Sequence, residues 1–180
     1  MIKKLILFIF LLFLTNCKSF ADVIYIPGDT NSLETAFSLL DEDEATVDSI
    51  IVTSAVSFLV SSPIQFKSGV ALVSDMESAE AAIVTSEFSS NIFEMTNPNS
   101  NTIIDKFKIQ NGYDDTSTGG AALRINTTIT SSAVFKNCIF FNNENDANGN
   151  GGSVEIYGSG SSSNRFERCP FRDNITTGDG

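Results

Sequence analysis

The chain has 180 residues, long enough for one domain with its own core, and its 22 acidic residues outnumber its 11 basic ones. The formal net charge of −11 disfavours binding to nucleic acids and to anionic lipid surfaces, since both are bound mainly through Lys and Arg. The sequence contains no histidine, which excludes Ser-His-Asp and Cys-His nucleophile systems and histidine-ligated metals.

Residues 1–21 have the three-part layout of a secretory signal peptide. A basic start, MIKK, precedes an apolar run at 5–14, which is too short to span a bilayer because a membrane helix needs about twenty residues. Ser19 and Ala21 provide small side chains at positions −3 and −1 for cleavage before Asp22. We therefore expect a protein that is secreted or displayed at the cell surface or outer membrane.

Cys17 supports a second interpretation of the same segment. The sequence LTNC resembles the lipobox of bacterial lipoproteins, in which the cysteine is lipidated and becomes the mature N-terminus. Asn16 replaces the small residue that usually precedes this cysteine, and little spacer remains before the strand expected at Val23. We favour ordinary cleavage over a lipid anchor, and an uncleaved anchor comes last. Every version exports the chain, and a lipid anchor is the only membrane contact that we expect.

The segment 22–48 is expected to form an N-terminal strand and a capping helix. VIYIPG, at 23–28, alternates in polarity and ends in a Pro-Gly turn. Asn31 and Glu34 then have the spacing of a capping box at the start of a helix. The acidic run DEDE that follows the helix is interpreted as a solvated turn, with a cation site as the alternative. The apolar stripe of this helix consists of Leu33, Ala36, Phe37 and Leu40.

From residue 49 onward, short runs of β-branched and aromatic residues are separated by Ser, Gly, Asn and Pro. None of them combines the length of a helix with a helical period. Brief strands at regular spacing are typical of a sandwich, a barrel or a β-solenoid. The runs lie at 50–60, 64–73, 81–86, 91–96 and 101–110.

A repeat in the second half decides among these three folds. FKNCIFFNN, at 135–143, aligns with FERCPFRDN, at 166–174, and Gly-Gly pairs open two strand-like runs. KFKIQNG is a weaker copy, in which Asn111 stands as far before a Gly-Gly pair as Asn143 does. The matched positions are Phe140 with Phe171, Asn143 with Asn174, and Gly119-Gly120 with Gly151-Gly152.

A unit of about 31 residues cannot bury its apolar face alone, so successive units must stack and share a core. Stacking brings equivalent residues onto neighbouring parallel strands ~4.8 Å apart. We therefore expect Phe140 to stack on Phe171 and Asn143 to form a ladder with Asn174. The paired glycines suit a sharp corner before the next strand. The sequence thus predicts an all-β solenoid of stacked coils over residues 49–180.

The alternating Gly-Gly-Ala and Phe-x-x-Asn motifs resemble the repeats of chlamydial polymorphic outer-membrane proteins and other secreted right-handed parallel β-helix proteins. Residues 23–75 also resemble the start of pectate-lyase-like (pectin lyase-like) β-helices, in which an N-terminal helix caps the first coil. The resemblance implies a right-handed parallel β-helix with an adhesin-like role. Its partners would be polysaccharides or host or cell-surface proteins. The motifs that carry it are Gly119-Gly120-Ala121, Gly151-Gly152-Ser153-Val154, Phe140 to Asn143, and Phe171 to Asn174.

The chain stops at NITTGDG, where the next Gly-Gly pair would fall. A solenoid needs a polar cap on its last coil, and an exposed strand edge pairs readily with another chain. We therefore expect either a fragment truncated at the C-terminus or a final coil that a partner covers.

Two cysteines occupy the same position in adjacent coils. The expected Cα separation of Cys138 and Cys169, ~4.8 Å, lies within the range that disulfides accept, and export favours oxidation. The alternative, which we prefer, is two small thiols stacked in the core.

The polar loops contain weak candidates for a calcium site. Asp114, Asp115, Glu144 and Asp146 would lie on one rim of the stack, where oxygen ligands suit Ca²⁺. Turns are rich in Asn, Asp and Gly for other reasons, and we prefer that interpretation. We expect no other cofactor.

The preferred function is display or binding of extended ligands at a surface, with no catalytic residue assigned. The alternative is a carbohydrate-active enzyme, a polysaccharide lyase or glycosidase, for which Arg124, Arg165, Arg168 and Glu155 are available. A third hypothesis is a shortened chain with no activity of its own. A fold alone does not decide among them, because one scaffold hosts many activities.

Overall fold

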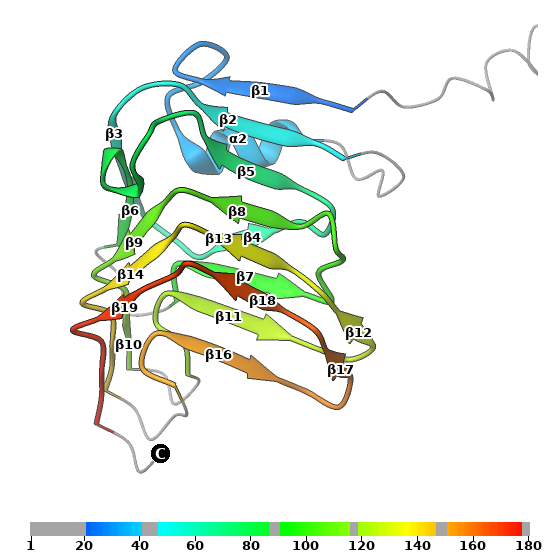
Figure 1. The fold of residues 1–180 in the computed structure, drawn as a ribbon, viewed down its shortest axis with the longest axis vertical. Coiled ribbons are helices and arrows are strands. Elements are labelled where there is room, and N and C mark those ends of the chain that lie inside the picture. The colour runs from blue at the N-terminus through cyan, green and yellow to red at the C-terminus, as the bar shows by residue number, and fades with distance from the viewer. Residues whose placement is uncertain (1–20, 41–46, 87–90, 116–118, 147–150, 178–180) are drawn as a thin grey trace, which may run out of the picture.

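The computed structural model describes residues 21–40, 47–86, 91–115, 119–146 and 151–177. These parts of the chain consist mostly of short β-strands, with one α-helix and one 3-10 turn, η1 (Ala79–Ala81). The paired strands run parallel, and they stack along one direction (Figure 1). The protein is therefore a β protein built from parallel sheets, as the sequence predicts.

Three larger sheets and two small ones contain these strands. Sheet A consists of β1 (Val23–Ile26), β2 (Ser49–Val52), β5 (Ala71–Ser74), β8 (Ile103–Asp105), β13 (Val134–Lys136) and β18 (Arg165–Glu167). Sheet B consists of β3 (Val56–Val60), β6 (Ala82–Ser86), β9 (Lys108–Gln110), β14 (Ile139–Phe141) and β19 (Phe171–Arg172). Sheet C consists of β4 (Ile64–Phe66), β7 (Phe93–Thr96), β11 (Leu123–Asn126) and β16 (Val154–Tyr157). The small sheets are β10 (Tyr113–Asp114), β15 (Glu144–Asn145) and β20 (Ile175–Thr176), and β12 (Thr130–Ser131) with β17 (Ser161–Ser162).

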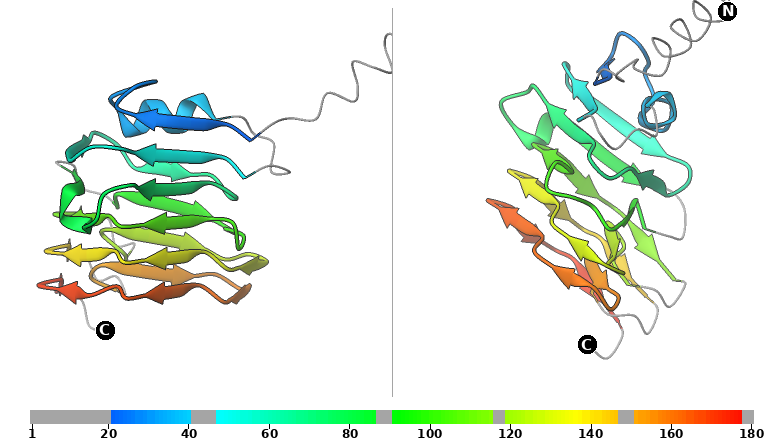
Figure 2. Two further views of the ribbon diagram at one scale, coloured as in Figure 1. Left: turned by 45° about the horizontal axis from the view of Figure 1, so that its top comes forward. Right: turned by 90° about the vertical axis from the view of Figure 1, so that its right-hand side faces the viewer.

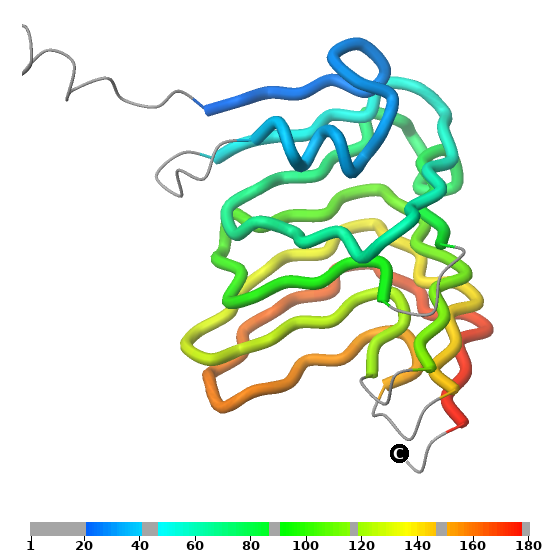
Figure 3. Tube along the Cα trace, turned by 180° about the vertical axis from the view of Figure 1, so that it is seen from behind, coloured from blue at the N-terminus to red at the C-terminus, as the bar shows by residue number. Residues whose placement is uncertain are grey.

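From β2 onward, the chain passes through sheets A, B and C in that order and then returns to sheet A. We call each such passage a coil. Seen from behind, the strands of sheet C follow one another in chain order below the helix (Figure 3). Strands of neighbouring coils pair with one another, and this arrangement is consistent with an all-β solenoid.

Alternation of side chains along each strand separates the core from the surface. The inward row of sheet A runs through Ile50, Leu72, Ile104 and Phe135, all with 0 % exposure. Because the strands pair in register, each of these side chains lies directly on the next. The core is thus a stack of apolar rows.

The phenylalanines of the repeat form two such stacks. The rings of Phe140 and Phe171 lie 4.6 Å apart with an interplanar angle of 4°, as the repeat predicts. The rings of Phe135 and Phe166 lie 4.6 Å apart at 11°. This distance matches the spacing of neighbouring strands, so the register of the sheets positions the rings.

Helix α2 (Leu33–Leu39) lies at the N-terminal end of the stack (Figure 2). The expectation that Asn31 is the N-cap is wrong by one residue, because Ser32 is extended and its Oγ accepts a hydrogen bond of 3.3 Å from the Thr35 amide. Ser32 Oγ also donates to the Glu34 carboxylate at 2.8 Å. The expected apolar stripe is buried: Leu33, Ala36, Phe37 and Leu40.

The register of sheet C corrects the alignment of the Gly-Gly pairs. Strand β11 pairs with β16 so that Gly120, and not Gly119, lies beside Gly151, and the Gly120 amide donates to the Gly151 carbonyl at 2.8 Å. Both residues have left-handed φ values, 77° and 81°. At this corner, the feature that repeats between the two coils is therefore one left-handed residue, a position at which glycine is favoured.

The asparagine repeat needs a similar correction. Asn111 lies beside Asn142, whose Nδ2 donates to Asn111 Oδ1 at 2.9 Å. Gly112 therefore takes the position above Asn143. A Cβ at Gly112 would lie 2.2 Å from the Ala121 carbonyl oxygen, so this coil has no room for an asparagine there.

The earlier coils differ in length, which hides the repeat from the sequence. Ile24 pairs with Ile50 and Ile50 pairs with Leu72, offsets of 26 and 22 residues. Ile104 pairs with Phe135 at an offset of 31. Equivalent positions exist from the first coil onward, but only the later coils space them evenly.

Two expectations concern residues outside the described part of the chain. Residues 1–20, with Cys17, carry the signal peptide and lipidation hypotheses, and Asp41–Glu44 carry the acidic turn. Within the described residues, no helix is long and apolar enough to cross a membrane.

Candidate functional site

A polar row crosses the outer face of sheet C. Gln65, Glu94, Arg124 and Glu155 lie in register on the sheet's consecutive strands. Their neighbours in sequence point inward, because side chains alternate along each strand. We call these four residues the sheet C ladder.

The ladder is held together by charge-assisted contacts. Arg124 Nε lies 3.2 Å from Glu155 Oε2, and its Nη1 lies 3.7 Å from Glu94 Oε1. Gln65 Nε2 donates to Glu94 Oε2 at 2.8 Å, and the Gly119 amide donates to Glu155 Oε2 at 3.3 Å. The side chains of Arg124 and Glu155 are 20 % and 15 % exposed, so the geometry is better defined than in a fully solvated pair.

A second row on the same outer face, two residues further along each strand, contains an aromatic ring. Thr96, Asn126 and Tyr157 lie in register there. The guanidinium carbon of Arg124 lies 4.3 Å from the centre of the Tyr157 ring, a cation–π contact. Past the strand ends, Asn97 Oδ1 accepts from the Thr128 amide at 2.7 Å.

This face therefore presents donors, acceptors and an aromatic ring at strand spacing, ~4.8 Å from one position to the next. Such a surface can bind an extended chain with many hydroxyl or amide groups. Glu94 and Glu155 lie two strands apart, ~9.6 Å between backbones by the same spacing. Both carboxylates face the Arg124 guanidinium that lies between them.

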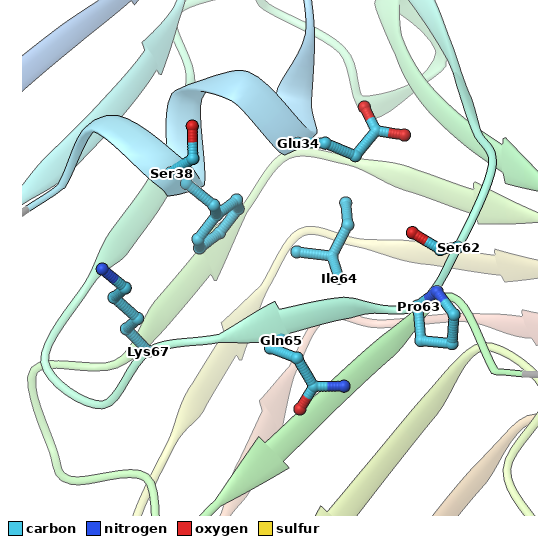
Figure 4. Close-up of a pocket in the computed structure, with 8 residues that line it drawn as sticks. Glu34, Ser38, Ser62, Pro63, Ile64, Gln65 and Lys67 are labelled. Atoms are coloured by element: carbon cyan, nitrogen blue, oxygen red, sulfur yellow. The ribbon is translucent and has the colours of Figure 1, made fainter.

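A pocket of about 260 Å³ lies beside the ladder, between helix α2 and strand β4 (Figure 4). Phe37 and Ile64 contribute apolar walls, and Gln65 belongs both to the pocket and to the ladder. The charged groups at its rim have partners within the chain: Lys67 Nζ donates to the Leu40 carbonyl at 2.7 Å, and Glu34 Oε1 accepts from the Ser61 amide at 3.2 Å. The pocket is thus a mainly apolar hollow next to the N-terminal end of the ladder.

The calcium candidates do not form a ligand set. Asp114 is fully buried, whereas Asp115 and Asp146 are exposed. Asp146 accepts hydrogen bonds from Tyr113 Oη at 3.1 Å and from a threonine of the next coil at 2.9 Å. Among the described residues, no group of three Cys, Asp or Glu side chains could hold a metal ion. Alternation along the short strands β10 and β15 turns Asp114 inward, whereas Asp115, Glu144 and Asp146 lie on the outer side.

The two cysteines are free thiols in this structure, so the disulfide that we weighed against stacked thiols is not formed. Cys138 is buried and Cys169 is half-buried. They follow paired strands, β13 and β18, at the same offset.

The predicted asparagine ladder is structural. Asn143 is fully buried, its Oδ1 accepts from the Gly112 amide at 2.9 Å, and its Nδ2 donates to the Ile109 carbonyl at 3.2 Å. Asn174 Oδ1 accepts from Asn143 Nδ2 at 2.9 Å and from the Asn143 amide at 3.0 Å. These side chains satisfy backbone groups at a corner.

Of the arginines expected near a polysaccharide site, only Arg124 belongs to the ladder. Arg165 lies on sheet A and contacts Glu167 at 3.5 Å. Arg168 lies at the corner after β18, where its Nε donates to Asn137 Oδ1 at 2.7 Å. The sequence analysis did not select Glu94 and Gln65. Each is a polar residue between apolar neighbours in the alternating runs of β7 and β4, and this pattern could have identified them.

No protein-family model, no curated protein and no solved structure matches the chain. The resemblance to chlamydial polymorphic outer-membrane proteins therefore stays a prediction.

Proposed function

We propose that this chain is an exported, right-handed parallel β-helix whose sheet C face binds extended ligands at a cell surface. The observation that carries the proposal is the sheet C ladder with Arg124 between two glutamates and over Tyr157. The ligands are polysaccharides, or host or cell-surface proteins that present an extended chain. The role is adhesin-like, as the motif resemblance implies.

The net charge of the sheet C ladder indicates which polymers it can bind. Arg124 neutralises one of its two glutamates, so the ladder carries a net negative charge, and the whole chain is acidic. Anionic polymers are repelled by such a face. Neutral or amino-bearing polymers suit it better, because they offer hydrogen-bond donors to the carboxylates.

A carbohydrate-active enzyme is the second candidate, and the same face favours it. Inverting glycosidases place two carboxyl groups ~6.5–9.5 Å apart. The backbones that carry Glu94 and Glu155 are ~9.6 Å apart, and both carboxylates are directed toward Arg124 between them. Binding remains our preference because both carboxylates are engaged with Arg124. An acid and a base with different protonation states need environments that differ.

The test is retention of the purified chain on an array of neutral, amino-bearing and anionic polysaccharides and surface proteins, with and without Ca²⁺. The products are analysed for shortened or unsaturated chains. Arg124→Gln removes the ladder's cation, and Lys136→Gln, on the outer face of sheet A, removes one cation elsewhere. We expect retention without cleavage, lost in Arg124→Gln and kept in Lys136→Gln.

Other outcomes separate the hypotheses. Cleavage that Glu94→Gln and Glu155→Gln abolish would make the chain an enzyme. Loss of retention on chelation would restore the calcium hypothesis. A folded protein that binds nothing would contradict the proposal and favour a fragment without activity of its own.

A further inference from the structure

Two thiols meet at one corner of adjacent coils. Cys138 lies between β13 and β14, and Cys169 lies between β18 and β19; Figure 1 shows these two pairs of strands. The strands on both sides pair in register, Phe135 with Phe166 and Phe140 with Phe171. The two cysteines are therefore direct neighbours on stacked corners, with Cα atoms ~4.8 Å apart by strand spacing, within the range of disulfides.

The two thiols differ in exposure and in contacts. Cys138 is completely buried, whereas Cys169 is half-buried and reachable from the C-terminal end of the stack. Cys169 Sγ lies 3.4 Å from the Phe135 carbonyl oxygen, in the coil of Cys138. The outer thiol thus lies against the coil of the inner one.

The pKa values of the two thiols also differ, and the more exposed thiol has the lower one. A hydrogen bond with the Cys138 thiol lowers the pKa of Cys169 to about 7, although partial burial acts in the opposite direction. The same contact, together with burial, raises the pKa of Cys138 well above its usual value. Asp105 on β8 is the charged group that acts on both thiols, and it raises both pKa values. Lys136 and Glu167 end the two flanking strands.

We propose that Cys169 and Cys138 form a thiol–disulfide site, in which Cys169 attacks and Cys138 resolves. The proposal is independent of the ligand-binding function. Its substrate class is a small disulfide, for example glutathione disulfide. Its product is a bond that joins the exposed C-terminal coil to the coil before it.

The exchange proceeds in two balanced steps. The Cys169 thiolate attacks one sulfur of the small disulfide, forms a mixed disulfide and releases the other half as a thiolate. The Cys138 thiol transfers its proton to that thiolate through solvent, and its sulfur attacks Cys169 Sγ and releases the second small thiol. The small disulfide is reduced to two thiols, and the two cysteines are oxidised to one disulfide.

The experiment uses the full chain with Cys17→Ser, so that the stacked thiols are its only cysteines. Limiting iodoacetamide is added between pH 5 and 10, and tandem mass spectrometry locates the first alkylated cysteine. We expect modification at Cys169 at least tenfold faster than at Cys138, with a midpoint near pH 7. Faster modification of Cys138, or a Cys169 midpoint at or above that of a free cysteine, about 8.5, would overturn the assignment.

Glutathione disulfide then tests the second step. The parent should lose two hydrogen atoms by mass and become protected from later alkylation. Cys138→Ala should instead accumulate a mixed disulfide at Cys169, and Cys169→Ala should remain unmodified, while circular dichroism verifies that both are folded. A parent that stops at the mixed disulfide would contradict the resolving role of Cys138. If a variant does not fold, the alkylation order in the parent still decides which thiol attacks.

Discussion

The two ends of the stack differ in how far they cover the core: among the described residues, a helix lies over the N-terminal end and not over the C-terminal one (Figure 2). At the N-terminal end, helix α2 buries Leu33 and Phe37 against the first coils, and both are at most 5 % exposed. At the C-terminal end, Phe171 is 47 % exposed, whereas Phe140, its equivalent one coil earlier, is fully buried. The same residue type in the same register is therefore core in one coil and surface in the next.

This difference shows that a coil's own sequence does not determine its burial. An inward side chain is covered by the coils on both of its sides, and a helix can substitute for a missing coil. Ile125 and Ile156 follow the same rule, with exposures of 0 % and 40 %. Matched substitutions at equivalent positions can measure how much each neighbouring coil contributes to the free energy of unfolding.

The largest effect is expected from the phenylalanine pair. Phe140→Ala should lower the free energy of unfolding by about 3–5 kcal/mol, because it leaves a cavity between packed coils. Phe171→Ala should cost about 1–2 kcal/mol, since its ring is half covered. Urea unfolding followed by circular dichroism measures both. Equal losses would mean that the C-terminal end is covered in solution, and the comparison would fail.

A smaller effect is expected at the helix. Leu33→Ala should lower the free energy of unfolding by about 2–4 kcal/mol, because Leu33 is fully buried against the core. Leu39→Ala, on the exposed side of the same helix, should change it by less than about 0.5 kcal/mol. The same urea titration serves as the measurement. A neutral Leu33→Ala would show that α2 does not close the core.

The asparagine ladder provides a third pair of matched substitutions. Asn143→Ala should cost about 1–3 kcal/mol, because it leaves the buried Gly112 amide and Ile109 carbonyl without their partner. Asn174→Ala should cost less, since water can reach this half-buried position. Hydrogen exchange of the Gly112 amide reports the loss directly. Unchanged protection in Asn143→Ala would contradict the role of this side chain.

The smallest expected effect is weak self-association at the C-terminal end, through the edges of β18 and β19. If two copies pair antiparallel, Arg165 of one faces Glu167 of the other, and such opposite charges stabilise neighbouring strands. Phe171→Glu should abolish the association, and Tyr25→Glu, equally exposed at the N-terminal end, should not. Sedimentation velocity over a range of concentrations tests this. Association that persists in Phe171→Glu would place the contact elsewhere.

The local sequence pattern was sufficient to predict several elements. The stripe of helix α2 and the pairing of Phe140 with Phe171 followed from spacing, because both depend on a period that the residues themselves show. The N-cap was displaced by one residue, from Asn31 to Ser32, because both side chains suit a cap and only the backbone distinguishes them. The Gly-Gly alignment was displaced for a similar reason: only Gly120 and Gly151 share the left-handed corner.

The sheet C ladder shows what spacing could not reveal. Arg124 and Glu155 were candidates from sequence, but Glu94 and Gln65 belong to coils whose lengths differ, so no repeat aligned them. Parallel pairing placed all four in one row. The calcium candidates show the opposite case, since Asp114 and Asp115 are adjacent in sequence but differ completely in burial.

The sequence by itself determined that this chain forms short stacked strands with one amphipathic helix near its N-terminal end, because apolar alternation and coil-length repetition are local properties. Only the tertiary structure decided which residues meet across coils, which left-handed corners need glycine, and which copy of each repeated side chain is buried. Those features depend on the register between coils and on what covers each end of the stack, and neither is encoded in the spacing of residues within one coil.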